Sequence, residues 1–188
     1  MADKGKFVVI TGPSASGKST LAEALLSRLS DAVRLVTLTT RTPRVGEQNG
    51  EHYTFVTVQE FNQKIDSGEL FEHAEVYGNL YGSSRLTLEQ LLSSHKFVLA
   101  VVDVQGAVTM KEKIPSAFVL FVKPSSLSDI ERRLRTERPD SSLEDITRRL
   151  ETAQKEMAIA KQFDATLDNI EGQFDAMVER ALSLLEKN

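Results

Sequence analysis

The sequence contains no cysteine, which excludes disulfide bonds, thiolate chemistry and zinc sites with cysteine ligands. This composition fits a reducing compartment, and we expect a cytoplasmic protein. Histidine is also scarce, since only His52, His73 and His95 are present and they share no motif. Because a zinc site needs several convergent ligands, these histidines do not predict one.

Long hydrophobic runs and an excess of positive charge are absent as well. The longest wholly apolar run, Phe97–Val102, is far too short to span a bilayer, and the first residues lead into a predicted strand without a signal-peptide core. The chain carries 23 lysine and arginine residues against 27 aspartate and glutamate residues, a net charge of -4. No protein-wide positive field is available to attract DNA or RNA. We therefore expect neither a membrane nor a nucleic-acid partner.

The segment Gly12-Pro-Ser-Ala-Ser-Gly-Lys-Ser19 matches the phosphate-loop pattern G-x-x-x-x-G-K-[ST]. It lies between an apolar run, Phe7–Ile10, and an amphipathic stretch, Lys18–Leu29, as a strand, loop and helix require. Glycines let backbone N–H groups curl around a phosphate, lysine adds a point charge, and the Ser19 hydroxyl is a magnesium ligand. The alternative, a simple glycine and serine turn, needs neither the lysine nor the hydroxyl. The predicted ATP-binding residues here are Gly12, Pro13, Ser14, Ala15, Ser16, Gly17, Lys18, Ser19 and Thr20.

The chain after the first helix predicts a small antiparallel insert within a parallel sheet. Between about Arg34 and Tyr81, short β segments alternate with glycine-containing turns; we expect strands at Val36–Thr40, Tyr53–Val58 and Leu70–Val76. A short helix near Leu86–Leu92 follows. The continuous apolar runs Phe97–Val102 and Phe118–Val122 are typical of buried parallel strands, so the parallel core resumes there.

The last third of the chain predicts helices. Ser126 to Asp129 has the spacing of a capping box, Pro139 breaks the helix that follows, and a second helix covers about Leu143–Lys161. Two helices joined by a charged, proline-containing link suit a mobile lid. A short segment near Thr166–Asp168 and a final amphipathic helix close the core. Arginines crowd this region, and a solvated helix face is the alternative for many of them: Arg132, Arg133, Arg135, Arg138, Arg148 and Arg149.

Four segments resemble the guanylate kinase family and occur in that family's order: Thr39–Phe55, Gly68–Glu72, Asn79–Ser83 and Val102–Ala107. The resemblance implies transfer of a phosphoryl group from ATP to GMP or dGMP, with Mg²⁺ and by a monomer or homodimer. It implies an α/β, P-loop nucleoside monophosphate kinase-like fold with a three-layer parallel-sheet core in one domain, 1–188. The core would comprise about 5–33, 94–125 and 162–188, a mostly-β GMP-binding lobe about 34–93, and a helical lid about 126–161.

By this resemblance, Arg41, Arg44, Tyr53 and Tyr81 hold the GMP phosphate. Arg41 and Arg44 are three residues apart around Pro43, a rigid arrangement that presents two guanidinium groups to one monophosphate. Each tyrosine adds a hydroxyl donor. The alternative is a surface turn with two tyrosines packed beneath it.

Guanine selectivity is assigned mainly to Glu72, because an ionised carboxylate only accepts hydrogen bonds and guanine offers N1–H and N2–H₂ side by side. The alternative for Glu72 is a charge at a strand edge. The family match adds Thr37, Gly82 and Ser83 to the GMP site. Asp103 directly follows a predicted strand and, by the resemblance, contacts either the guanine side of the site or a magnesium-bound water. The family commonly has a second acidic residue two positions earlier, where this chain has Val101.

The lid departs from the family pattern, since one extra residue separates its arginines and Pro139 replaces a glycine. We match Arg133, Arg138 and Arg149 to the arginines that fold over ATP. Asn169 matches an asparagine near the adenine, although Ile170 follows it in place of an acid. Catalysis requires alignment of the two nucleotides and stabilisation of charge, without a covalent nucleophile or a general base. The residues assigned to it are Lys18, Arg41, Arg133, Arg138 and Arg149.

Two other functions are compatible with the phosphate loop. One is a related kinase that phosphorylates another small phosphate ester, such as a ribose bisphosphate precursor; Glu72 and the Arg41–Arg44 segment argue against it. The other is a non-catalytic, guanylate-kinase-like module that binds partner peptides. The intact Lys18 and Ser19 argue against that function.

Overall fold

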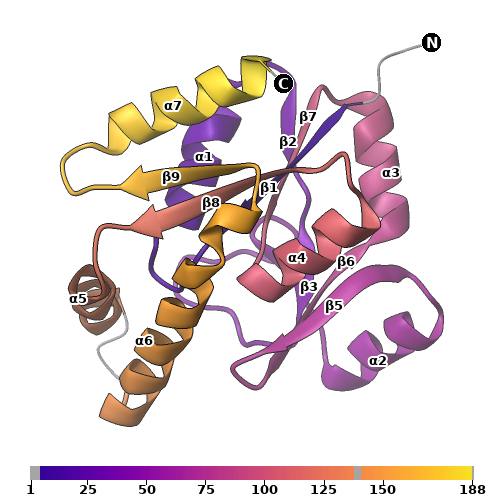
Figure 1. Cartoon of the computed structure of the whole chain (residues 1–188). Coiled ribbons are helices and arrows are strands. Elements are labelled where there is room, and N and C mark those ends of the chain that lie inside the picture. The colour runs from indigo at the N-terminus through magenta and orange to yellow at the C-terminus, as the bar shows by residue number, and fades with distance from the viewer. Residues whose placement is uncertain (1–4, 138–140, 188) are drawn as a thin grey trace. The chain divides into compact units, whose positions relative to one another are not determined.

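A computed structural model of the chain describes residues 5–137 and 141–187 and shows strands alternating with helices (Figure 1). The strands form a five-stranded sheet in the order β2-β7-β1-β8-β9 and a four-stranded sheet in the order β4-β3-β6-β5. Arg138 and Pro139 lie outside the described residues. The strands are β1 (Lys6–Thr11), β2 (Ala32–Arg34), β3 (Thr37–Thr39), β4 (Tyr53–Phe55), β5 (Leu70–Val76), β6 (Asn79–Ser84), β7 (Phe97–Val101), β8 (Phe118–Pro124) and β9 (Ala165–Asn169). The helices are α1 (Lys18–Arg28), α2 (Val58–Asp66), α3 (Arg85–Ser94), α4 (Val104–Lys113), α5 (Leu127–Glu137), α6 (Leu143–Ala158), the 3₁₀ turn η1 (Ala160–Gln162) and α7 (Phe174–Lys187).

The described residues divide into two compact units. The first, here called the acceptor unit, comprises the residues up to Val8, Ser30–Ala100 and Gln105–Ala117. The second, here called the loop unit, comprises Val9–Leu29, Val101–Val104 and the residues from Phe118 onward. The two units are described separately below.

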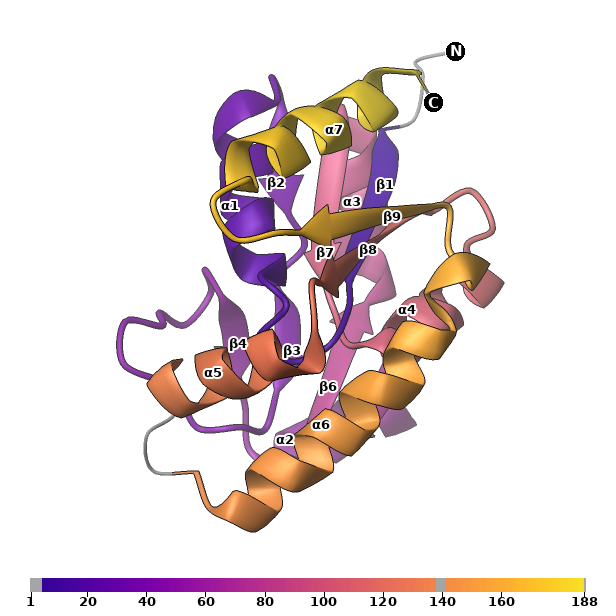
Figure 2. The ribbon, with the colours of Figure 1, turned by 60° about the vertical axis from the view of Figure 1, so that its left-hand side comes forward.

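In the loop unit, apolar strands are covered by amphipathic helices, as their sequence patterns require. Strands β8 and β9 pair in parallel from Leu120 opposite Ala165 to Pro124 opposite Asn169. Helix α7 contacts both β9 and α1 (Figure 2). The Phe121 and Phe163 rings stack with their centroids 5.8 Å apart. The apolar run predicted from Phe118 is therefore a buried strand, and the final amphipathic helix is confirmed.

In the acceptor unit, β5 and β6 form an antiparallel hairpin, and β6 also pairs antiparallel with β3. The fourth strand, β4, pairs with β3 in parallel, so the prediction of a purely antiparallel insert was wrong at this edge. The physical reason is the long connection between them, residues 40–52, which returns the chain to the end of the sheet where β3 began. Hairpins need only short turns, whereas parallel neighbours need such a crossover.

Helix α2 was missed in the sequence, where we expected strand to continue to Val58. The strand ends at Phe55 because Thr57 and Glu60 form a capping box that starts a helix. The backbone N–H of Glu60 donates to Thr57 Oγ1 at 3.2 Å, and the backbone N–H of Thr57 donates to Glu60 Oε2 at 2.7 Å. This Thr-x-x-Glu spacing is a readable signal that competed with the β-branched residues around it.

Two further elements differ from the expectation. Helix α4 begins at Val104, directly after the strand that ends at Val101, and was not predicted. The segment Asn79–Ser83, which was not among the expected strands, belongs to strand β6, and the turn before it lies at Tyr77 and Gly78, whose φ values are 50° and 76°. The residues of this segment that were matched to the GMP site, Tyr81, Gly82 and Ser83, therefore lie on a strand.

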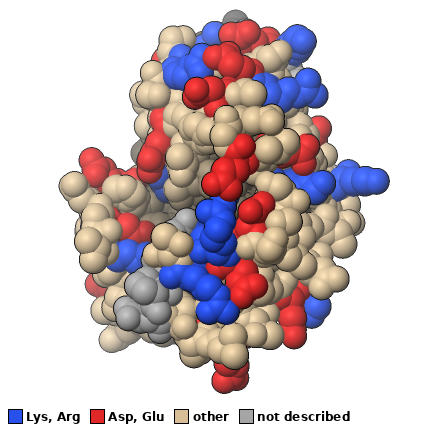
Figure 3. All heavy atoms as spheres, turned by 90° about the vertical axis from the view of Figure 1, so that its left-hand side faces the viewer, with Lys and Arg blue, Asp and Glu red and all other residues tan. Residues whose placement is uncertain are grey.

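Charges of both signs are interspersed on the face of the molecule shown in Figure 3. Among the residues that the structure describes, none of the helices combines the length and the apolar character that a bilayer crossing demands. Both observations agree with the charge balance of the sequence.

Replacing Thr57 by alanine removes the capping box, and we expect the free energy of unfolding to fall by about 1 kcal/mol. Urea denaturation followed by circular dichroism measures this change. Gln59→Ala, an exposed substitution within the same helix, is the matched control and should leave the midpoint almost unchanged. Equal midpoints for Thr57→Ala and Gln59→Ala would contradict the capping role.

Candidate functional site

The phosphate-loop segment joins β1 to α1 in the loop unit with a backbone that only certain residues allow. Gly12, Ala15 and Gly17 have φ values of 141°, 58° and 95°. A Cβ atom at Gly12 would clash with the carbonyl oxygen of Val122, so this position requires glycine. Gly17 is the N-cap of α1 and provides no side-chain cap. A helix N-terminus of this kind is suited to an anion.

The Lys18 ammonium lies across this loop. Its Nζ atom donates to the carbonyl oxygens of Gly12 and Pro13 at 2.8 and 2.7 Å. A point charge held by two loop carbonyls is in place for the phosphates that the loop is expected to bind.

Two residues from distant parts of the loop unit also bond to the loop backbone. Asn169, which is 7% exposed, donates from Nδ2 to the carbonyl oxygen of Ser16 at 2.8 Å. Arg133 donates from a terminal nitrogen to the carbonyl oxygen of Ala15 at 3.2 Å. The predicted ATP-binding residues Asn169 and Arg133 are thus brought to the phosphate loop.

Asp103 lies beside the strand that leads into the loop. The backbone N–H of Val102 donates to Ile10 at 3.1 Å, and Thr11 Oγ1 donates to the carbonyl oxygen of Val102 at 3.2 Å. These bonds fix the chain immediately before Asp103. Val101, where the family has an acid, is 5% exposed and ends the buried strand β7.

Glu156, on helix α6, is a residue that the sequence did not single out. Burial raises the pKa of its carboxyl group to about 7; the positive charge of Lys18 opposes this and the negative charge of Asp103 adds to it. Glu156, Lys18 and Asp103 therefore interact electrostatically. The sequence carries no signal for this, because Glu156 stands in an ordinary amphipathic helix.

Of the other arginines in the predicted lid, Arg149 has a largely buried side chain, whereas the Arg148 side chain is exposed. Asp145 Oδ2 accepts from Arg149 Nε at 2.7 Å, and Asp145 Oδ1 accepts from Arg148 at 3.0 Å. The Arg149 side chain is 12% exposed. The hydrogen bond from Arg149 outweighs partial burial and lowers the pKa of Asp145. Surface ion pairs occupy Arg132 and Arg135, which fits the interpretation of a solvated helix face for these two.

In the acceptor unit, the predicted phosphate-binding residues Arg41, Tyr53 and Tyr81 gather in one place. The Arg41 guanidinium lies 5.4 Å from the Tyr53 ring centroid, and the two tyrosine rings meet edge to face at 6.0 Å. Glu47 Oε1 accepts from Arg41 at 2.8 Å. Arg44 is exposed in the same turn. Glu47 was missed in the sequence, where its position three residues after Arg44 was the available signal.

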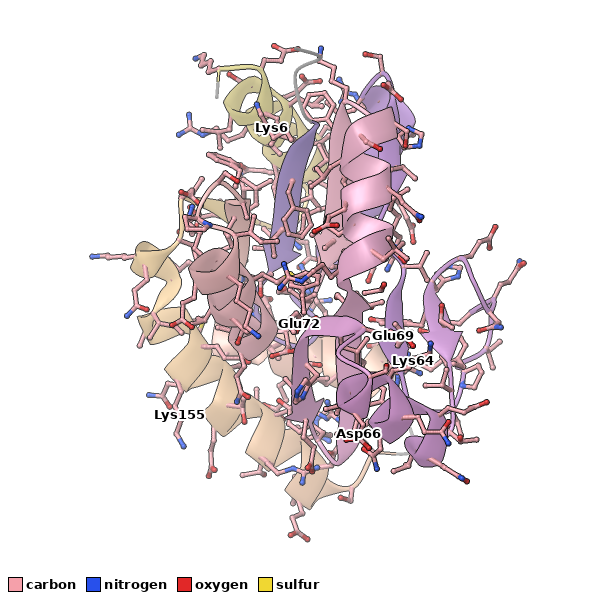
Figure 4. All side chains as sticks on the ribbon, turned by 90° about the vertical axis from the view of Figure 1, so that its right-hand side faces the viewer. Lys6, Lys64, Asp66, Glu69, Glu72 and Lys155 are labelled. Atoms are coloured by element: carbon pink, nitrogen blue, oxygen red, sulfur yellow. The ribbon has the colours of Figure 1, made fainter. Side chains whose placement is uncertain are left out.

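The predicted guanine-reading residues lie on adjacent strands of the four-stranded sheet. Glu72, labelled in Figure 4, lies on β5. It is directly opposite Ser83 on β6, and Thr37 is on β3. All three are buried, with exposures of 3% for Glu72, 0% for Ser83 and 4% for Thr37. A carboxylate this buried is not a solvated charge at a strand edge. Lys64 and Glu69, also labelled in Figure 4, form a more exposed ion pair whose charged atoms are 2.7 Å apart.

Gly82 has a packing role in this sheet. A Cβ atom there would lie 2.9 Å from Leu70 Cδ1, 3.0 Å from Phe61 Cζ and 3.1 Å from the carbonyl oxygen of Glu72. A side chain at this position would therefore require its neighbours to shift.

Among the described residues, the buried side-chain nitrogen and oxygen atoms without a hydrogen-bond partner are Ser16 Oγ, Arg41 Nε and Ser83 Oγ. Buried polar atoms are nearly always paired in folded proteins, because an unmade hydrogen bond costs free energy. Each of these atoms belongs to a residue predicted to contact a nucleotide. They mark the positions at which ligand atoms are expected.

The residues available for a metal suit Mg²⁺. Ser19 offers an exposed hydroxyl in the first turn of α1, a hard oxygen ligand. Within residues 5–137 and 141–187, no cluster of three or more histidine, cysteine, aspartate or glutamate residues is arranged to hold a metal. This donor set fits an ion that takes one protein oxygen and completes its shell with phosphates and water.

The sequence matches the model of one protein family, described as Guanylate kinase, over residues 4–188. The curated guanylate kinase of Wolbachia sp. subsp. Brugia malayi (strain TRS) is 40% identical over 189 residues, 98% of this chain and 94% of the relative. The guanylate kinase of Clostridium perfringens (strain SM101 / Type A) is 41% identical over 142 residues, 74% of this chain and 66% of the relative, just under two thirds of its length.

A solved structure gives the same result. The crystal structure of guanylate kinase from Anaplasma phagocytophilum matches with a TM-score of 0.78 and 28% identity, over 100% of this chain and 87% of that one. The similarity thus includes both units and every segment that carries a predicted site residue.

Replacing Glu156 by glutamine should change how stability depends on pH. The raised pKa means that the folded state holds this proton more tightly than the unfolded state, so its stabilising contribution is complete below about pH 4.5 and is lost as the pH rises through about 7. We expect the melting temperature of Glu156→Gln, relative to wild type, to increase between pH 4.5 and pH 8. Thermal unfolding at a series of pH values measures this difference.

The exposed Glu151→Gln substitution in the same helix is the control, and its difference from wild type should not vary with pH. A difference for Glu156→Gln that is equally constant would contradict the raised pKa of Glu156.

Proposed function

The chain belongs to the guanylate kinase family, and we infer that it transfers the γ-phosphoryl group of ATP to GMP, giving ADP and GDP. One structural observation carries this inference for the present chain. The buried, unpaired polar atoms of the described residues fall on Ser16 in the phosphate loop and on Arg41 and Ser83 in the acceptor unit. The Ser16 atom lies in the segment predicted to bind ATP, the phosphoryl donor. The Arg41 and Ser83 atoms belong to residues predicted to bind GMP, the phosphoryl acceptor.

The donor, ATP, is assigned to the phosphate loop. Backbone N–H groups at the start of α1 bind its phosphates, and the Lys18 ammonium, now held by loop carbonyls, pairs with them. The Ser19 hydroxyl is the protein ligand for Mg²⁺, which supplies charge neutralisation on the phosphate oxygens when bound. Asn169 and Arg133 hold the loop from the side and complete the ATP site.

The acceptor, GMP or dGMP, is assigned to the four-stranded sheet and the loop that follows β3. Arg41, Arg44, Tyr53 and Tyr81 bind its phosphate, because a dianion needs donors and positive charge without competing acceptors. Glu72 accepts hydrogen bonds from the two N–H groups of guanine, and the hydroxyl groups of Thr37 and Ser83 complete the base contacts. Gly82 and Asp103 also belong to this site. Asp103 contacts either the guanine side of the site or a magnesium-bound water.

The chemical step is a direct in-line displacement. An oxygen of the GMP phosphate, already anionic at neutral pH, forms a bond to the γ-phosphorus while the bond to the β-γ bridging oxygen breaks and leaves ADP. Lys18, Arg41, Arg133, Arg138 and Arg149 stabilise the charge that spreads over the transferred group. Residues 126–161 form the lid that excludes water, the competing acceptor, and residues 34–93 form the GMP-binding lobe.

Other features stay predictions from the sequence. They are the use of dGMP, a monomeric or homodimeric state, a cytoplasmic location and the lack of nucleic-acid and membrane partners. A non-catalytic binding module is the second candidate function. The lysine in place across an intact phosphate loop favours the kinase over the module.

Replacing Lys18 by alanine should lower turnover by about a hundredfold or more, because the charge on the β- and γ-phosphates is no longer neutralised. The assay measures ADP formed from ATP, Mg²⁺ and GMP, with AMP, CMP and UMP as control acceptors. Lys187→Ala, at the exposed end of α7, is the matched control. Wild-type protein without GMP-dependent turnover would overturn the kinase function, and full activity in Lys18→Ala would overturn the role of the lysine.

Replacing Glu72 by glutamine should narrow the preference for GMP over AMP by about tenfold or more, because the amide replaces one acceptor with a donor that faces guanine N–H groups. The ratio of kcat/KM for the two acceptors measures the preference. Glu75→Gln, exposed on the same strand, removes an equal charge and should leave the ratio unchanged. An unchanged ratio in Glu72→Gln would refute the assigned role.

A further inference from the structure

Glu47 joins the two arginines that are assigned to the GMP phosphate. Its Oε1 atom accepts from a terminal nitrogen of Arg41 at 2.8 Å, and its Oε2 atom accepts from the backbone N–H of Arg44 at 2.8 Å. The backbone N–H of Glu47 donates in return to the carbonyl oxygen of Arg44 at 3.0 Å. One carboxylate therefore fixes the side chain of the first arginine and the main chain of the second.

This ion pair is shielded from water. The side chains of Arg41 and Glu47 are 12% and 16% exposed, and the guanidinium lies 5.4 and 5.9 Å from the ring centroids of Tyr53 and Phe55. Burial raises the pKa of Glu47, but the hydrogen bonds from Arg41 and from the Arg44 backbone lower it more, so the carboxylate is ionised at neutral pH. Losing one partner of such a pair leaves the other charge uncompensated.

The hydrogen bonds of Arg41 fix the orientation of its guanidinium group. One terminal nitrogen donates to Glu47, and the other donates to the carbonyl oxygen of Thr42 at 2.7 Å. The backbone N–H of Arg41 donates to Oγ1 of the fully buried Thr39 at 3.2 Å. Because the guanidinium is a rigid plane, these bonds also fix the direction of its Nε–H. That atom is buried and has no partner within the described residues.

We propose that Glu47 is a positioning residue for the acceptor phosphate, which orients Arg41 and the Arg44 turn without touching the nucleotide itself. The proposal rests on the assignment of these arginines to GMP. It opposes a simpler expectation, in which a carboxylate next to a phosphate site repels the ligand and competes for the arginine. Under that expectation, removing the charge of Glu47 improves GMP binding; under ours, it weakens GMP binding.

The first experiment compares GMP with guanosine, which has the same base and sugar and no phosphate. Calorimetry with Glu47→Gln should show GMP binding weakened roughly 10- to 100-fold, because the guanidinium loses its orientation, whereas guanosine binding stays as in wild type. Glu51→Gln makes the same charge change at an exposed position of the same loop and should affect neither ligand. In the steady state, the change in Glu47→Gln should appear mainly in the KM for GMP.

The second experiment tests whether Glu47 acts through Arg41. In an Arg41→Ala background, adding Glu47→Gln should weaken GMP binding much less than it does in the wild type, since only the bond from the Arg44 backbone to Glu47 is then left to lose. Thermal unfolding confirms that each variant is folded. Should Glu47→Gln fail to fold, Glu47→Asp keeps the charge but is too short to reach both donors, and it should show the same selective loss for GMP.

The outcomes separate the proposal from the function on which it rests. Tighter or unchanged GMP binding in Glu47→Gln, equal losses for GMP and guanosine, or a full additional loss in the Arg41→Ala background would each overturn the positioning role while GMP-dependent activity of the wild type stands. Normal GMP binding in Arg41→Ala alone would overturn the acceptor assignment together with the role of Glu47.

Discussion

Positive side chains gathered at one site repel one another and need partners, and this constraint applies in both units of the protein. In the loop unit, two backbone carbonyls hold the Lys18 ammonium and another holds Arg133. Carboxylates hold Arg149 and, in the acceptor unit, Arg41. Neutral carbonyls thus hold Lys18 and Arg133 at the phosphate loop. Carboxylates serve positions at which orientation of a guanidinium matters.

In the acceptor unit, some of the hydrogen-bond donors of the predicted site residues already have protein partners, whereas others are buried without one. Arg41 has its terminal nitrogens engaged and its Nε–H unpaired, and Ser83 is buried opposite Glu72 with its hydroxyl unpaired. Leaving a buried donor unpaired destabilises the fold by on the order of 1–3 kcal/mol, which a nucleotide that supplies the missing acceptor returns as binding free energy. Sites of this kind gain selectivity because a ligand without the matching atom leaves the cost in place.

The sequence predicted the elements whose signals are local and strong. The strand and helix around the phosphate loop and the buried strands that begin at Phe97 and Phe118 agree with the residue patterns. Helix α2 was missed because the β-branched residues before it favoured strand, and the parallel pairing of β3 with β4 depends on the path of the connecting loop. Glu156 could not be singled out from the sequence, because folding alone brings it close to Lys18 and Asp103, which are distant in sequence. Glu47 lies near its partner Arg41 in sequence, but the loop conformation that joins them has no local signature.

The N-cap of α1 has a consequence for how secondary structure and ligand are related. Gly17 lends no side chain to the N–H groups of the first turn, and the first intrahelical bond in that turn runs from Leu21 back to Gly17 at 3.0 Å. The helix therefore starts without a side-chain cap. Under the proposed function, a bound triphosphate takes the place of that cap, so that the ligand becomes part of the secondary structure. Amide hydrogen exchange in the first turn of α1 would then report occupancy of the proposed donor site.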